Sequence, residues 1–189
     1  PFDEFNEDDV PTLQPEPKNK TGIYRVAVED IKVDPEQYQF RTKVNKEGVD
    51  NRLNGVEQWD DARSGVVLLH KRKDGSIYVA DGHHRVDLAK RLGQKELNAR
   101  FINEEDGATV EQAREEAAMN NIADGKAEAI DIAKVMRNSG HDIKSIRQSA
   151  NLPNNQLVKD GQSIAELNDN VFGMVVSGQL NDKDGAAIG

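Results

Sequence analysis

Residues 79–93 read V-A-D-G-H-H-R-V-D-L-A-K-R-L-G, and this segment is the most informative one in the sequence. The apolar run at residues 77–80 predicts a short strand, and Asp81 and Gly82 then form a tight turn. The next apolar residues recur at helical spacing, which predicts a helix with one buried face: Val86, Leu88, Ala89 and Leu92. Gly93 is placed to end that helix.

The strand–turn–helix pattern puts His83, His84 and Arg85 on the first turn of a helix that leaves a sheet. Backbone N–H groups and the helix dipole favour an anion at this position, and an arginine there can grip a phosphate with two hydrogen bonds. A plain sheet-to-helix turn has the same composition. The residues alone leave both interpretations open.

The motif also resembles a known family. D-G-H-H-R followed by A-x-x-x-G is similar to the signature turn of the ParB/sulfiredoxin superfamily, and three more segments resemble ParB-type proteins in the same order. These are residues 28–35 with Gln39-Phe40-Arg41, residues 116–122, and residues 167–180. The resemblance covers residues 23–189. It implies an α+β fold, in which a small mixed sheet with helices is followed by an all-helical, helix-turn-helix-like lobe.

Composition divides the chain into three parts. Residues 1–21 form a predicted acidic, proline-containing linker, since residues 1–20 hold six acids, four prolines and only two lysines. Residues 22–107 form the predicted ParB/sulfiredoxin-like domain, and residues 108–189 the helical ParB-type lobe. Within the first domain, residues 23–33 alternate in hydropathy and predict one strand.

The overall charge limits the classes of function. A net charge of -9 opposes non-specific adhesion to nucleic acid. The sequence has no apolar run near eighteen residues, so we expect no membrane partner, and the lack of cysteine fits a reducing, cytoplasmic location. The chain starts at Pro1 without a methionine, from which we expect it to be part of a longer polypeptide.

The helical lobe contains a candidate DNA reader. Residues 142–150 and 154–167 predict two helices on either side of Asn151-Leu152-Pro153, an arrangement similar to a helix-turn-helix. Its candidate DNA-binding residues are Asn155, Gln156 and Lys159. Residues 140–189 carry four basic against six acidic side chains, which favours a purely structural lobe, and both interpretations stay open.

Differences within the superfamily narrow the chemistry. Sulfiredoxins carry a redox cysteine where this chain has His83, and the chain has no cysteine, which excludes sulfinic acid reduction by that mechanism. Partition proteins of the ParB type read G-E-R-R at this turn and bind CTP phosphates there. Their E-N-x-Q-R box is replaced here by residues 120–124, with Asn120 in place of the acid, while Arg85 and Asn121 are kept.

The free-serine kinases of the superfamily carry D-G-H at the same turn. That resemblance implies catalytic roles for Asp81 and His83, with Glu36 as a further acid, and Asp81 as the residue that holds Mg²⁺. The resemblance to the superfamily as a whole implies that a nucleoside triphosphate, CTP or ATP, is bound at its phosphates by five residues: Arg41, Gly82, His84, Arg85 and Asn121. Zinc bound by Asp81, His83 and His70 is a further alternative.

We therefore predict a ParB-like nucleotide-binding domain, with hydrolysis or transfer of a phosphate as its candidate reaction. The D-G-H-H-R form also resembles the DdrB-like branch of polyvalent phage and plasmid proteins. DNA and a second copy of the chain, in a homodimer, are further candidate partners. Two other classes stay open: a ParB-like DNA-binding domain or nuclease, and a catalytically silent interaction module of a large polyvalent protein.

Overall fold

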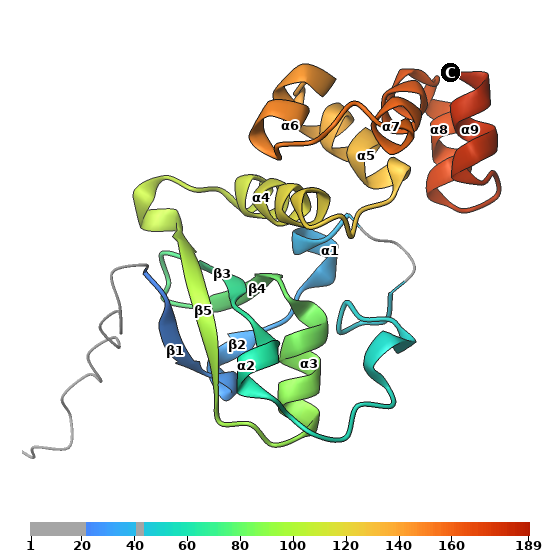
Figure 1. Cartoon of the computed structure of the whole chain (residues 1–189). Coiled ribbons are helices and arrows are strands. Elements are labelled where there is room, and N and C mark those ends of the chain that lie inside the picture. Colours follow the sequence, from blue (N-terminus) through green and yellow to red (C-terminus); the bar gives the residue numbers. More distant parts are fainter. Residues whose placement is uncertain (1–21, 41–43) are drawn as a thin grey trace, which may run out of the picture.

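The computed structural model describes residues 22–40 and 44–189. These residues form a lobe built on a sheet and a lobe built of helices, with the long helix α4 (Val110–Ala123) between them (Figure 1). The predicted linker at residues 1–21 lies outside the described residues, and so does Arg41, which is predicted to bind phosphate.

The first lobe has one five-stranded mixed sheet. Its strands are β1 (Tyr24–Ala27), β2 (Ile31–Lys32), β3 (Val67–Lys71), β4 (Ile77–Asp81) and β5 (Glu96–Asn103), in the order β1-β5-β3-β4-β2. The β1–β5 and β3–β4 pairs are antiparallel, whereas β3 runs parallel to β5 and β2 parallel to β4. The predicted α+β class with a small mixed sheet is confirmed.

The prediction of one strand over residues 23–33 is wrong. A 3-10 turn at Val28–Asp30 divides this segment, so that β1 pairs with β5 at one edge of the sheet and β2 pairs with β4 at the other. Val28 and Ile31 are both buried and lie three residues apart. This is the spacing of a 3-10 turn, and a strand would bury residues two apart.

Helices cover both faces of the sheet. Besides α4, the lobe contains the short helices α1 (Pro35–Tyr38) and α2 (Asp61–Ser64) and the longer α3 (His83–Arg91). Val86 and Ala89 of α3 pack on one face against alternate residues of β3 and β4, namely Val67, Leu69 and Val79. Ala113 and Ala117 of α4 pack on the other face, against Leu68 and Ala80. Alternate residues of each strand therefore point to opposite faces of the sheet and belong to two separate cores.

His70 is a structural residue. Its ring is buried, with Nδ1 2.7 Å from the Tyr38 hydroxyl and Nε2 3.2 Å from the Ala108 carbonyl oxygen. Because a carbonyl only accepts, Nε2 carries the proton and Nδ1 accepts from Tyr38, whose pKa is raised by burial. Both ring nitrogens are thus used, which removes His70 as a zinc ligand. The described residues hold no group of three or more His, Cys, Asp or Glu side chains fit for a metal ion.

The second lobe consists of α5 (Ala129–Ser139), α6 (Ile143–Ser149), α7 (Gln156–Glu166), α8 (Asp169–Val176) and α9 (Asp182–Ile188). The helices α6 and α7 match the two predicted at residues 142–150 and 154–167. Gly161 of α7 lets that helix approach α5 closely, since a Cβ there would lie 2.7 Å from Cβ of Ile132. No helix in the described part of the chain is long and apolar enough to span a membrane.

Candidate functional site

A cavity of about 240 Å³ lies where the turn before α3 meets α4 and the start of the helical lobe. Six of the predicted site residues line it together: Asp81, Gly82, His83, His84, Arg85 and Asn121. They come from two segments forty residues apart in the sequence. The fold therefore brings the D-G-H-H-R turn and the α4 amide to one place.

Gly82 allows β4 to turn directly into α3. It has φ +102°, a conformation that other residues rarely adopt, and a Cβ there would lie 2.7 Å from Cγ1 of Val67. Its carbonyl oxygen accepts from the N–H groups of Arg85 at 2.9 Å and Val86 at 3.0 Å, which starts the helix. The turn therefore aims the first turn of α3 at the cavity because only glycine fits at its centre.

Arg85 lines the cavity and also ties α3 to the start of β3. Its Nη1 donates to the carbonyl oxygen of Val66 at 2.7 Å. A guanidinium has five N–H groups in a fixed fork, so this single bond leaves further donor capacity for a ligand. His83 beside it is buried, and a Cβ at Gly48 would lie 2.7 Å from its Cδ2.

His84 anchors a loop that the motif does not include. Its Nε2 lies 3.0 Å from Oδ1 of Asp50, whose carboxylate also accepts from Nε of Arg52 at 2.7 Å and from Nη2 at 2.5 Å. The hydrogen bonds from Arg52 hold the pKa of Asp50 well below its usual range, and His84 adds to this shift. Asp50 therefore stays ionised and holds Arg52, which lines the cavity.

One face of α4 forms the opposite wall. Four residues of α4 line the cavity, and because they are three or four positions apart they share one face of the helix: Arg114, Ala117, Ala118 and Asn121. Nδ2 of Asn121 lies 3.4 Å from Oδ1 of Asp81 and donates to the Ala117 carbonyl oxygen at 2.8 Å. Asp81, at the end of β4, is thereby linked to the helix across the cavity.

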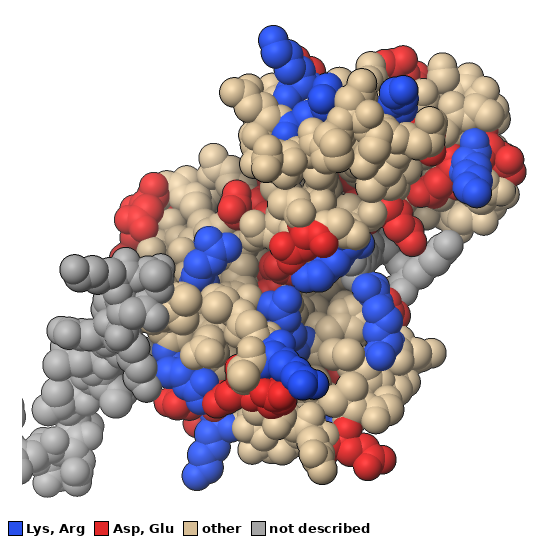
Figure 2. Space-filling view, in the orientation of Figure 1, with Lys and Arg blue, Asp and Glu red and all other residues tan. Residues whose placement is uncertain are grey.

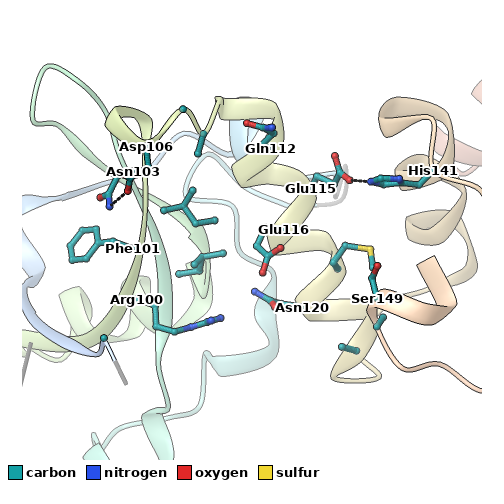
Figure 3. Close-up of a pocket in the computed structure, with 18 of the residues that line it drawn as sticks. Arg100, Phe101, Asn103, Asp106, Gln112, Glu115, Glu116, Asn120, His141 and Ser149 are labelled. Atoms are coloured by element: carbon teal, nitrogen blue, oxygen red, sulfur yellow. Dashed lines mark hydrogen bonds and ion pairs between the residues drawn. The ribbon is translucent and has the colours of Figure 1, made fainter. Parts of the chain in front are cut away.

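Asn120 faces a different space. It lines a wider groove of about 1000 Å³ between β5, α4 and α6 (Figure 3). Arg100 and Glu116 line the same groove, and Glu115 pairs with His141 of the helical lobe at 2.6 Å. Neighbouring helix residues point about 100° apart, so Asn120 and Asn121 serve two different cavities.

Four other predicted residues lie away from this cavity. Glu36 is exposed on α1 and does not line it. In the helical lobe, Asn155 caps α7 by accepting from the Val158 N–H at 3.1 Å, and Gln156 donates to Asp160 at 2.6 Å. Lys159 is exposed. The roles predicted for these four residues, and for Arg41, stay predictions.

The cavity is positive on an acidic chain. Its described lining holds four cationic side chains, Arg52, Arg85, Arg114 and Lys126, against two carboxylates, Asp81 and Asp131. The whole chain carries a net charge of -9. Figure 2 shows Lys and Arg side chains gathered near the junction of the two lobes, with acidic side chains among them. This local excess of positive charge favours an anionic ligand.

Three of these cations were not among the predicted site residues. Arg114 had a signal in the sequence, since it precedes Asn121 by seven residues, two turns of the same helix. Arg52 and Lys126 lie outside α3 and α4, in a 3-10 turn at Asn51–Leu53 and in the connection from α4 to α5. No helical periodicity links them to the motif.

Comparison with solved structures supports the fold. The chain is similar to the crystal structure of the C-terminally truncated chromosome-partitioning protein ParB from Caulobacter crescentus complexed to the centromeric parS site, with TM-score 0.51 and 19% identity over 87% of this chain and 83% of that one. A structure of truncated Caulobacter crescentus ParB complexed with CTP-gamma-S gives TM-score 0.42 and 18% identity, over 88% and 91% of the two chains. No family model and no curated protein matches the sequence. The chain has a ParB-like fold, as its motifs predict.

Proposed function

We propose that this chain binds a nucleoside triphosphate together with Mg²⁺ in the cavity between the D-G-H-H-R turn and α4. The observation that carries the proposal is that the D-G-H-H-R turn and Asn121, forty residues after Asp81, line one cavity with an excess of positive charge. A protein with a net charge of -9 has no general affinity for polyanions, so a local positive cavity indicates a specific anionic ligand.

The phosphates would lie against the first turn of α3. The dipole of α3 and the backbone at Gly82 favour negative charge at this end of the helix. Arg85 adds a guanidinium on the same turn, and His84 holds the loop that carries Arg52. These groups come from separate elements, so a bound ligand would connect them.

The residues present fit Mg²⁺. Asp81 and Asp131 are the two carboxylates that line the described part of the cavity. Mg²⁺ is commonly bound by one or two carboxylates together with substrate phosphates and water, so the absence of a three-ligand cluster in the described residues agrees with this ion. Bound Mg²⁺ would neutralise phosphate charge. Asp81 would hold it, and Asn121 would fix the orientation of that carboxylate.

We propose nucleotide binding, without turnover, as the function of this site. Phosphoryl transfer needs a group that activates the acceptor in addition to the residues that hold the phosphates. Glu36, the predicted further acid, is exposed and outside the cavity. Release of phosphate from a bound triphosphate, measured over hours at saturation, would instead assign hydrolysis to the Asp81 and His83 pair.

Calorimetric titration tests the proposal. ATP, CTP and GTP are each added to the chain with and without Mg²⁺, and at least one is expected to give saturable heat that depends on the metal. Arg85→Ala should weaken this binding about tenfold to a hundredfold, because a hydrogen bond to a charged group is lost. Absence of heat with all three nucleotides would reject a nucleotide site and favour the silent interaction module.

DNA binding by the helical lobe is the second candidate. It is favoured by the fold, since the ParB structure similar to this chain is a complex with parS DNA. Against it, Asn155 and Gln156 already make hydrogen bonds within α7, and the lobe carries more acids than bases. A gel shift on plasmid DNA that weakens with salt and with Lys159→Ala would restore this candidate.

A further inference from the structure

We propose that Arg114 makes the cavity selective for ligands with a chain of phosphates, so that nucleoside triphosphates bind and monophosphates bind poorly. The inference rests on the proposed nucleotide site and assigns a specificity to one residue in it. Arg114 lies outside the D-G-H-H-R motif, on the wall formed by α4.

The position of Arg114 determines how long a ligand must be to contact both this residue and the D-G-H-H-R turn. Asn121, at one end of the α4 face, lies beside Asp81 and the start of α3. Arg114 is seven residues earlier in α4, about 10 Å along the helix axis at 1.5 Å per residue. A ligand that contacts both the D-G-H-H-R turn and this end of the α4 wall must therefore be longer than a single phosphate group.

The other cations of the cavity already have partners. Arg52 is held by Asp50, Lys126 pairs with Asp124 at 2.6 Å, and Arg85 donates to the Val66 carbonyl oxygen. Each of these contacts satisfies part of the donor capacity before any ligand arrives. A ligand gains less from donors that are already satisfied.

Arg114 differs from them. Its guanidinium lies over the ring of Phe40, with Cζ 4.8 Å from the ring centroid. Its Nε is buried and, among the described residues, has no hydrogen-bond acceptor. Because Nε has no exposed surface, a ligand oxygen would accept from the other N–H groups of the guanidinium, which lines the cavity, and such a hydrogen bond to a charged donor is strong. The terminal phosphates of a triphosphate can supply that oxygen.

The test compares phosphate chains of different length. Native chain and Arg114→Gln are titrated with the mono-, di- and triphosphate of one nucleoside and with inorganic tripolyphosphate, all with Mg²⁺. Native protein should prefer the triphosphate over the monophosphate by about a hundredfold. Arg114→Gln should lose about tenfold or more for triphosphate and tripolyphosphate, while affinity for the monophosphate stays within about twofold.

Arg147→Gln is the matched control. Arg147 is also a half-buried helical arginine whose buried Nε has no acceptor in residues 22–40 and 44–189, but it does not line this cavity. It should change stability as much as Arg114→Gln does and leave every affinity unaltered. Equal weakening of monophosphate and triphosphate by Arg114→Gln, or no weakening, overturns the inference and leaves nucleotide binding intact. Failure of every phosphate compound to bind overturns both proposals.

Discussion

Gly82→Ala is expected to destabilise the chain by about 3 kcal/mol and to abolish nucleotide binding. Two costs add together. A side chain at φ +102° strains the backbone, and its Cβ would lie 2.7 Å from Cγ1 and 3.1 Å from Cβ of Val67. Relief of this contact requires β4 and β3 to separate, or the first turn of α3 to tilt away from the cavity.

Gly75→Ala separates these two costs. Gly75 lies in the connection between β3 and β4, with φ +81° and nothing within 4 Å of the position of an added Cβ. Gly75→Ala should therefore destabilise the chain only through backbone strain at positive φ, by about 1–2 kcal/mol, and nucleotide binding should be retained. Urea denaturation of both variants, followed by a nucleotide titration, gives the comparison. If Gly82→Ala costs no more than Gly75→Ala, the contact with Val67 does not hold the turn.

Gly161→Ala is expected to destabilise the helical lobe by about 2 kcal/mol, although alanine favours a helix. An added Cβ would lie 2.7 Å from Cβ of Ile132 and 3.0 Å from the Ala129 carbonyl oxygen, and neither atom is the end of a flexible side chain. The helices α5 and α7 must therefore move apart. This loosens the packing that supports Asp131 at the cavity wall.

Gly173→Ala is expected to have the opposite effect on stability. Gly173 lies in α8 and has nothing within 4 Å of the added Cβ, so the higher helix propensity of alanine should stabilise the chain by up to about 1 kcal/mol. Thermal melting followed by circular dichroism measures both variants. A melting temperature that is unchanged or raised by Gly161→Ala would show that α5 and α7 are not tightly packed at this approach.

Local patterns were sufficient to predict the elements that surround the candidate site. The apolar run before Asp81, the helical spacing after it and the glycines at 82 and 93 correctly predicted β4 and α3, and hence the position of the Asp81–Arg85 turn. Asn121 was predicted from the resemblance to ParB-type helices, and the structure places it 3.4 Å from Asp81. These features depend on neighbours close in sequence or on a shared motif.

Contacts between segments that are distant in the sequence could not be predicted from local patterns. The break in the strand at Val28–Asp30 depends on partners in β4 and β5, which local alternation does not contain. Arg52 reaches the cavity only because Asp50 is anchored to His84, 34 residues away in sequence. Arg114 faces the cavity because α4 crosses the sheet with Ala113 and Ala117 inward. Such positions follow from tertiary packing.

Binding of a magnesium nucleotide between the D-G-H-H-R turn and α4 is tested most directly by the amide chemical shifts of the ¹⁵N-labelled chain during titration with a nucleoside triphosphate and Mg²⁺. Saturable shifts are predicted at Gly82, His83, His84, Arg85 and Asn121, with the amides of α8 and α9 unchanged. Shifts confined to the helical lobe, or none at saturating nucleotide, would contradict it.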